Sequence, residues 1–178
     1  MKSRWMLVLL VAALGVTAYV GNVLATPSVG QTTTILAKAT VDDLDLKGRQ
    51  LTTTLGPNGR QIPTGIWLAW LQTHGASDLY VVDNKFTPNG GTSGWHSHPG
   101  PSIVFVVAGT VTNYSSDEPG CAPQRYTAGQ SFVDSGGDDQ HKIVNEDPSV
   151  TAETIAVQIL PAGAQRRSEP PPPPGCPL

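Results

Sequence analysis

Three of the four histidines in this 178-residue chain are the residues best placed to do chemistry. His96 and His98 are two positions apart, so in an extended strand both side chains project from the same face. His141 opens a second short segment, residues 141–145, and a neighbouring strand there would bring a third imidazole beside the first two. Three imidazoles on one face could hold a divalent transition metal and leave positions open for water, oxygen or a chelating substrate.

The identity of such a metal stays open among Fe, Mn, Ni, Cu and Zn, because affinity and availability compete. A single His-x-His pair is a weak signal by itself, and a pair of surface or loop histidines is the plain alternative. His74, between Thr73 and Gly75, is expected to be solvated. The sequence has no Ser-His-Asp motif and no phosphate-binding loop.

Further polar residues are candidates for contacts near the metal. Ser102 could hydrogen-bond a metal-bound water, while Tyr114 and Arg125 could contact an acid. Four residues shortly precede His141, and one of them could reach the site: Asp134, Asp138, Asp139 and Gln140. A polar turn explains that run equally well.

Short strands joined by turns must position these residues. The chain has 19 Gly and 16 Pro, which excludes a helical bundle or a coiled coil. Trp67 and Trp70 are expected in the core of a buried strand. Apolar and β-branched runs predict strands over residues 32–40, 65–72, 79–86, 103–108, 110–114, 124–126, 131–134, 141–145 and 150–160. With no amphipathic helix expected, the sequence predicts an all-β sandwich or jelly roll.

The histidines also belong to two longer motifs. The final His-x-x-x-Asn of the second cupin motif is matched by residues 141–145. The first cupin motif is matched in spacing by Gly90, His96, His98 and Gly109. Over residues 78–160 the chain therefore resembles the cupin superfamily, especially small exported single-domain bacterial cupins. The resemblance implies a double-stranded β-helix, a jelly-roll barrel, with a metal held at its mouth by the three histidines.

Two departures from the cupin pattern change the expected chemistry. The glutamate ligand of the first motif falls on Ser102, and the Pro and Gly of the second fall on Gly136 and Asp138. Three neutral imidazoles leave a divalent metal both of its positive charges, whereas a glutamate would cancel one. We therefore expect a gap beside Ser102 and a preference for an anionic, bidentate ligand.

The expected function follows from similarity to three-His cupins that oxidise thiols or cleave diketones. It is that of a dioxygenase or other oxidoreductase acting on a small chelating anion. The alternatives are a binding protein for small molecules without turnover and a structural cupin whose histidines have lost their role.

The beginning of the chain predicts export. Residues 1–25 have a basic start, an apolar run over residues 6–20 and small residues near Ala25, as a secretory signal peptide does. An uncleaved anchor is the alternative, because a membrane helix needs about 20 residues, and only then is membrane contact expected. Secretion or a periplasmic location would place Cys121 and Cys176 in an oxidising compartment, where a disulfide between them is expected.

The rest of the chain is predicted to hold one domain. Residues 26–64 are expected to form a strand and a connecting segment, residues 65–161 the barrel, and residues 162–178 a Pro-rich tail that the disulfide ties down. The formal net charge of −3 argues against nucleic acid, which needs a basic face. The expected partner is a small-molecule ligand, and a homodimer is left open.

Overall fold

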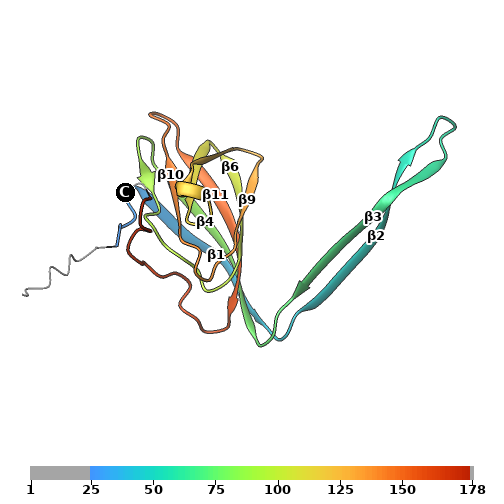
Figure 1. Ribbon diagram of the computed structural model, residues 1–178, viewed down its shortest axis with the longest axis horizontal. Coiled ribbons are helices and arrows are strands. Elements are labelled where there is room, and N and C mark those ends of the chain that lie inside the picture. The colour runs from blue at the N-terminus through green and yellow to red at the C-terminus, as the bar shows by residue number, and fades with distance from the viewer. Residues whose placement is uncertain (1–24, 177–178) are drawn as a thin grey trace, which may run out of the picture.

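The computed structural model describes residues 25–176 of the chain (Figure 1). Residues 1–24, on which the signal-peptide prediction rests, lie outside this part. The strands are β1 (Gln31–Val41), β2 (Asp45–Leu55), β3 (Gln61–Gln72), β4 (Ser77–Phe86), β5 (Gly91–Thr92), β6 (Ser102–Ala108), β7 (Thr110–Ser115), β8 (Gln124–Thr127), β9 (Ser131–Asp134), β10 (His141–Asn145) and β11 (Ala152–Pro161), with one 3-10 turn, η1 (Pro119–Cys121). None of the described residues belongs to a helix long and apolar enough to cross a membrane.

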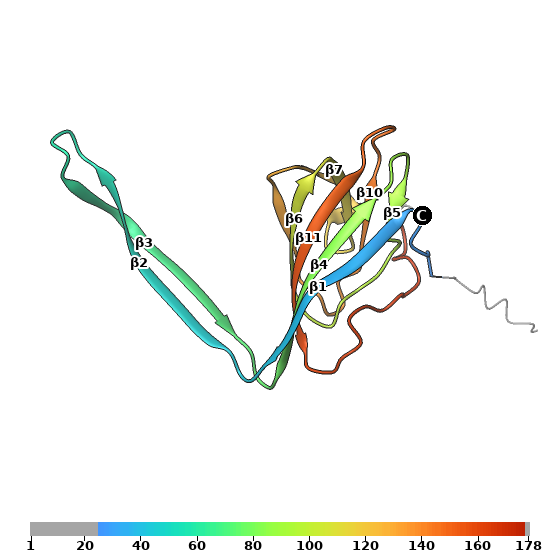
Figure 2. The ribbon, with the colours of Figure 1, turned by 180° about the vertical axis from the view of Figure 1, so that it is seen from behind.

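Two antiparallel sheets face each other and form the barrel (Figure 2). One sheet has the strand order β1-β4-β11-β6-β9 and the other has the order β5-β10-β7-β8. From β4 to β11 the chain crosses from one sheet to the other at every step except that from β7 to β8. This interleaving makes a double-stranded β-helix, so the predicted all-β jelly-roll barrel is confirmed.

Alternate residues of the strands fill the space between the sheets. β6 and β11 bury every second side chain, as the two-residue period of a strand requires. At one end of the barrel the inward side chains become polar, with Ser102 on β6 and Gln158 on β11. The apolar cluster consists of Tyr80, Val82, Phe86, Val104, Val106, Val111, Phe132, Ile143, Ala152, Ala156 and Leu160. The fold therefore has an apolar core and, at one end, a polar interior.

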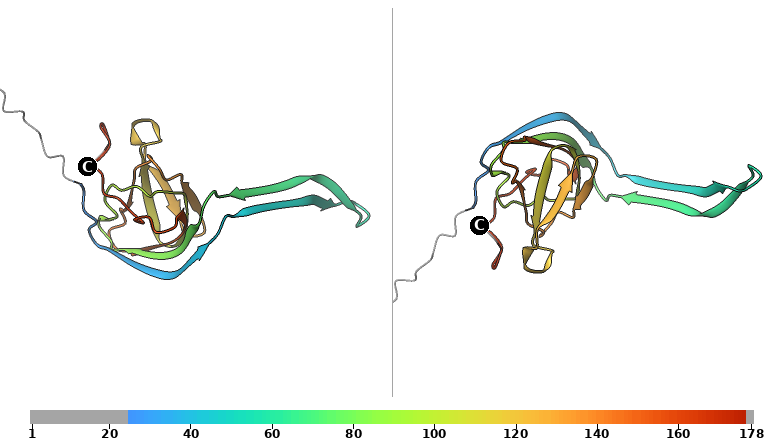
Figure 3. Two further views of the ribbon diagram at one scale, coloured as in Figure 1. Left: turned by 90° about the horizontal axis from the view of Figure 1, so that it is seen from below. Right: turned by 90° about the horizontal axis from the view of Figure 1, so that it is seen from above.

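β2 and β3 form a separate two-stranded arm that projects away from the barrel (Figure 3). The sequence predicts a buried strand over residues 65–72 with Trp67 and Trp70 in the core, and this prediction is wrong. Trp67 is 55% exposed and Trp70 is 70% exposed. Within residues 25–176 their strand pairs with β2 alone, and no second sheet covers it. An apolar run shows that a segment can be buried but cannot show which sheet it joins.

The barrel also begins elsewhere than the sequence predicts. β1 matches the strand predicted over residues 32–40, which was expected outside the barrel, but it pairs with β4 along its length as an edge strand of the five-stranded sheet. The barrel thus includes residues 31–41, and residues 45–72 leave it as the arm. The physical reason is that the arm is inserted between two strands that pair with each other, and the spacing of strands along a sequence does not reveal such an insertion.

Asp78 on β4 joins three segments and should make the stability of the barrel depend on pH. Its carboxylate accepts hydrogen bonds from Thr40 and the Gly163 N–H, and it pairs with Lys38 Nζ at 2.9 Å. These contacts, Thr40 first, lower the pKa of Asp78 to about 2. Since this value lies below that of the unfolded chain, the stabilisation is complete above about pH 4 and is lost as the pH falls toward about 2.

We therefore expect Asp78→Asn to lower the free energy of unfolding at neutral pH. The difference from the wild type should shrink steadily between about pH 4 and pH 2, because the wild-type carboxylate is then being protonated. Urea denaturation at several pH values measures both effects. An unchanged difference across this range would show that the carboxylate of Asp78 is not the group responsible.

Candidate metal centre

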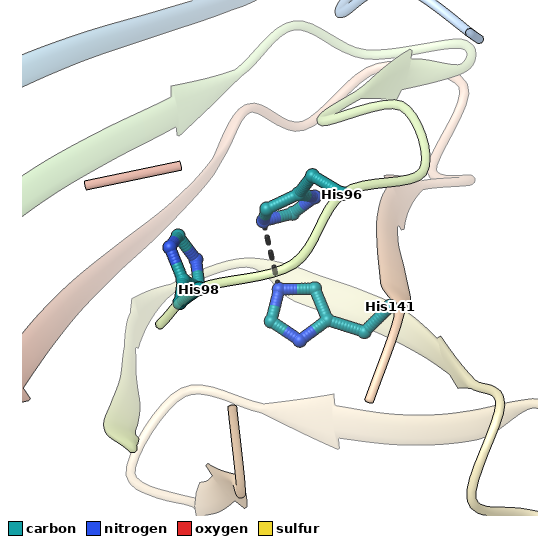
Figure 4. A group of neighbouring side chains, drawn as sticks. All are labelled: His96, His98 and His141. Atoms are coloured by element: carbon teal, nitrogen blue, oxygen red, sulfur yellow. Dashed lines mark hydrogen bonds between the residues drawn. The ribbon is translucent and has the colours of Figure 1, made fainter. Parts of the chain in front are cut away.

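Backbone pairing places two of the histidines opposite each other. An isolated antiparallel bridge joins His96 to His141: the His96 N–H donates to the His141 carbonyl at 3.0 Å, and the His141 N–H donates to the His96 carbonyl at 2.9 Å. Residues paired in this way project from the same face. His98 follows two positions after His96 and lies beside them (Figure 4). The structure thus brings together the three residues that the sequence singled out.

The three imidazoles form a compact buried cluster. His96 is 4% exposed, His98 5% and His141 2%. The ring centroids of His96 and His141 are 4.2 Å apart, and those of His96 and His98 are 4.9 Å apart. One nitrogen from each ring lies within 4.8 Å of the others. This spacing is small enough for one ion to contact all three rings.

Each ring has an acceptor on its outer side. His96 Nδ1 lies 2.9 Å from the Gly94 carbonyl, and His98 Nδ1 lies 2.7 Å from the Arg166 carbonyl. A carbonyl oxygen can only accept, so both Nδ1 atoms carry the proton. His141 Nδ1 faces Asp134 Oδ1 at 3.5 Å. Such outer partners fix the tautomer and turn the bare Nε2 atoms toward a metal.

The donor set fits a divalent transition metal. With the protons on Nδ1, the Nε2 lone pairs of His96 and His141 face each other at 2.8 Å, which is repulsive unless a positive charge lies between them. Two nitrogen ligands bound at about 2.1 Å and at a right angle lie about 3 Å apart. A bound metal therefore accounts for the 2.8 Å between the Nε2 atoms of His96 and His141. The alternative is a proton shared between these two nitrogens.

Burial keeps two of the rings in the form that binds metal. It lowers the pKa of His96 well below its ordinary value, and the charges of His141 and Arg167 lower it further. Burial also lowers the pKa of His98 to about 4, against the raising effect of its hydrogen bond to Arg166. Both rings are therefore neutral at pH 7, as a metal-ligating imidazole must be.

The gap expected beside Ser102 is filled by a carboxylate. Ser102 is 1% exposed and lines the cavity beside the histidines, but β9 pairs with β6 so that Asp134 lies opposite it. Oδ2 of Asp134 is 4.0 Å from His98 Nε2 and has no hydrogen-bond partner among the described residues. The expectation of a doubly charged metal without a carboxylate is therefore wrong. The strand pairing supplies from β9 the negative charge that the first motif lacks.

Asp134 is buried yet ionised. Burial acts to raise the pKa of Asp134, but the hydrogen bond and the charge of His141 outweigh it and lower the pKa below its ordinary value. An ionised carboxylate beside three imidazoles raises their basicity as ligands and compensates the charge of a bound cation.

We expect Asp134→Asn to weaken metal binding about 10–100-fold, because the amide keeps the shape of the side chain and loses its charge. Competition with a chromogenic chelator at neutral pH measures the affinity. Asp138→Asn, in the exposed turn before β10, is the matched control and should bind like the wild type. Equal affinities for the two variants would show that the Asp134 carboxylate has no part in the site.

The tail contributes residues that the sequence analysis missed. Arg166 and Arg167, just after β11, line the same cavity as the histidines. Arg166 Nη1 donates to Gln158 Oε1 at 3.1 Å, and Arg167 donates to the carbonyl of Ser93. Two adjacent arginines ahead of a Pro-rich tail are visible in the sequence, but nothing there directs them back to the barrel. They place two guanidinium groups beside the cluster, and that of Arg167 also pairs with Glu169 Oε1 at 2.6 Å.

The cavity is small and partly open to the surface, because Thr33, Arg166 and Arg167 in its lining are exposed or half-buried. Its volume is about 30 Å³, enough for two or three water molecules at about 10–15 Å³ each. The amide of Gln158 extends from β11 into it, with Nε2 3.1 Å from Ser102 Oγ and 3.3 Å from His98 Nε2. An organic substrate can enter only if part of the lining moves.

Residues 162–176, here called the strap, cover the site. They leave β11 and run back along the barrel (red in Figure 2). The backbone of Ser168 pairs with Ser97, with N–H···O distances of 3.0 and 3.1 Å. A disulfide joins Cys176 to Cys121, whose Cα atoms are 5.4 Å apart. Both of these contacts follow the two arginines in the chain, and before the arginines the Gly163 N–H donates to Asp78 Oδ2 at 3.0 Å.

Three of the predicted site residues lie elsewhere. Tyr114 donates to Glu146 Oε1 at 2.9 Å, and Arg125 lies exposed on β8. The backbone of Gln140 bonds to Ser116, outside the cavity. Their neighbours in the sequence are near the histidines, but the strand alternation and the turn before β10 direct their side chains away.

Comparisons with known proteins agree on the fold and leave the activity open. No protein-family model matches the chain, and a search of curated proteins gave no match. Among solved structures the chain is similar to a cupin superfamily protein from Desulfitobacterium hafniense, with a TM-score of 0.39 and 8% identity over 46% of this chain and 67% of that one. It is also similar to a conserved protein with a double-stranded β-helix domain from Klebsiella pneumoniae, with a TM-score of 0.42 and 20% identity over 51% and 73% of the two chains.

A cupin-like protein from Thermotoga maritima gives a TM-score of 0.43 and 19% identity over 52% of this chain and 65% of that one. All three descriptions name the cupin or double-stranded β-helix fold. The strand order and the site of this chain themselves define a double-stranded β-helix barrel with three clustered imidazoles at one end.

Proposed function

We propose that the chain binds one divalent transition metal through His96, His98 and His141, with Asp134 as the compensating carboxylate. The observation that carries the proposal is the orientation of the rings. Each Nδ1 faces an outer acceptor, and the Nε2 atoms of His96 and His141 face each other at 2.8 Å inside the protein. A buried cluster arranged in this way is stable when a cation neutralises the converging lone pairs.

Elemental analysis tests this proposal. The exported protein, purified without chelators, should carry about one equivalent of Fe, Mn, Ni, Cu or Zn. A chain that carries less than a tenth of an equivalent, and that does not take up these metals on titration, would refute a metal site and favour the structural alternative.

We further propose a small anionic compound as the substrate. A redox-active divalent metal on this donor set would supply Lewis-acid and electron-transfer chemistry at its open positions. The guanidinium groups of Arg166 and Arg167 would attract and orient a carboxylate or a similar oxyanion. The amide of Gln158 would hydrogen-bond the bound compound once it turns from His98. A dioxygenase or other oxidoreductase of a small chelating anion fits these roles.

Binding without turnover is the second candidate, and the small volume of the cavity favours it. At about 30 Å³ the cavity admits an organic molecule only if part of its lining moves. Oxygen uptake by the metal-loaded protein with thiols, diketones and phenols separates the two candidates. Uptake above that of the free metal supports the enzyme, and saturable binding without uptake supports the binding protein.

We expect Arg167→Gln to weaken binding of oxalate, a small bidentate anion, about tenfold or more, because one charge-assisted contact is lost. Isothermal titration of the metal-loaded protein measures the affinity. The metal content should stay unchanged, since Arg167 contacts a carbonyl and no proposed ligand. Arg125→Gln, which removes an exposed charge from β8, is the matched control. Equal effects of the two substitutions would refute a specific role for Arg167.

We also propose that the protein works outside the cytoplasm, in a secreted or periplasmic location. The Cys121–Cys176 disulfide supports this, because disulfides persist in oxidising compartments. Intact mass of the protein recovered after export would report whether residues 1–25 have been removed.

A further inference from the structure

The arm, β2 with β3, has apolar side chains on both of its faces. One face carries Trp67, packed over Gly48, and the other carries Trp70, whose ring lies 5.4 Å from Lys47 Nζ. The exposed large apolar residues of the arm are Leu46, Leu51, Leu55, Ile62, Ile66, Trp67, Leu68 and Trp70, between 45% and 72% exposed. An isolated two-stranded ribbon is marginally stable in water. An arm of this composition therefore requires a partner surface.

The five-stranded sheet of the barrel has an uncovered apolar face of its own. Strands beside water normally alternate apolar and polar residues, but β6 presents Ile103, Phe105 and Val107 outward at 42%, 43% and 47% exposure. Val133 on β9 pairs across from Ile103 and is 67% exposed. The outward residues of β11 next to them include Ile155, Val157 and Ile159. Strands that are apolar on both faces are typical of a sheet that is covered on both sides.

The arm cannot cover the sheet of its own chain. Only three residues join β1 to β2 and four join β3 to β4. Within this junction Leu44 and Thr73 exchange two hydrogen bonds of 3.0 Å, and the Gly75 N–H donates to Asp43 Oδ1 at 2.7 Å. These bonds tie the two short linkers to each other at the base of the arm, and the arm points away from the barrel, as both views of Figure 3 show.

We infer that two copies of the chain exchange arms, so that the arm of each lies on the outer face of β11, β6 and β9 in its partner. A second copy is the occupant that the dimensions fit. At about 3.4 Å per residue and about 4.8 Å between strands, the arm is about 37 Å long, and the five-stranded sheet is about 20 Å wide. The arm is thus long enough to span the apolar face completely.

The area fits a stable dimer as well. Laid along β11, which has 10 residues and is about 34 Å long, an arm face about 10 Å wide covers about 340 Å², so two arms on two sheets bury about 1,400 Å² in total, within the range of specific interfaces. When the two chains exchange arms about a two-fold axis, each arm binds the sheet of the other chain. No arm or sheet is then left to bind a third copy, so the assembly stops at a dimer. The arm face with Leu51, Ile66, Leu68 and Trp70 is the one we place against the sheet, since Leu68 and Trp70 are each 70% exposed. Lys47 and Arg49, which pair with Trp70 and Leu68, share this face, and their long side chains can reach past the contact into water.

Sedimentation velocity of the exported protein tests the inference. We expect the mass of two chains at micromolar concentration. Leu68→Glu on the arm and Phe105→Glu on the sheet should each raise the dissociation constant about a hundredfold or more, since each places a charge in the interface. Asn58→Glu, at the tip of the arm, adds the same charge outside the contact and should leave the dimer intact. Circular dichroism confirms that each variant keeps its strands.

Cross-linking distinguishes this dimer from others. A Leu68→Cys chain mixed with a Phe105→Cys chain should form a mixed disulfide, whereas arms that pack on each other would cross-link Leu68→Cys with itself. A wild-type protein that sediments as a monomer refutes the inference. The arm would then be expected to bind another protein or a lipid surface. A dimer that survives both glutamate substitutions also refutes it.

Discussion

Replacing His141 with alanine is expected to abolish stoichiometric metal binding. His141 supplies the nitrogen that lies 2.8 Å from His96 Nε2, and its other nitrogen is the one that faces Asp134. Its removal takes away one of the three proposed ligands and leaves the Asp134 carboxylate beside His98 alone, at 4.0 Å from Nε2. Loss of a ligand from a three-imidazole set exceeds the 10–100-fold effect typical of outer residues. We expect the metal content to fall from about one equivalent to below about a tenth.

The fourth histidine provides the matched control for this experiment. His74 is exposed in the connection between β3 and β4, so His74→Ala should retain the full metal content. Both variants should unfold cooperatively, which circular dichroism can verify. If the His141→Ala protein kept its metal, the three-imidazole site would be wrong even though the rings cluster.

Removing the disulfide is expected to have the largest effect on stability. Cys121 and Cys176 are separated by 55 positions, and closing a loop of that length in the unfolded chain corresponds to about 4 kcal/mol. We expect a variant with both Cys121→Ser and Cys176→Ser to lose about that much of its free energy of unfolding, a large part of a typical net stability of about 5–15 kcal/mol. Urea denaturation of the two proteins in oxidising buffer measures the difference.

The same substitution should also release the strap. Without the disulfide, one end of the strap is held by the Ser97–Ser168 pairing alone, so a chelator should remove the metal faster from the variant. Denaturation in the presence of a reductant is the control, because both proteins then lack the disulfide and should unfold alike. Equal stability in oxidising buffer would show that the disulfide does not constrain the unfolded chain.

The sequence by itself determined those features that depend on residues close together in the chain, namely the strands and the shared face of neighbouring side chains. The positions of His96 and His98, two residues apart, fix their common face, and residues 141–145 identify the third histidine of the cluster through the cupin resemblance. Alternation and turn residues predict the strands of the barrel, since a side chain in a strand reverses its direction at every step. The pairing of Cys121 with Cys176 followed from there being two cysteines and a predicted oxidising compartment.

The tertiary structure alone decided which distant segments meet. Asp134 reaches the site because β9 pairs with β6 in the register that places it opposite Ser102. Arg166 and Arg167 reach it because the strap turns back over the barrel. Trp67 and Trp70 leave the core because their strand pairs with β2 in the arm. Each of these outcomes depends on a pairing between strands or on the path of a loop, and the free-energy differences that select them arise from contacts between residues far apart in the sequence.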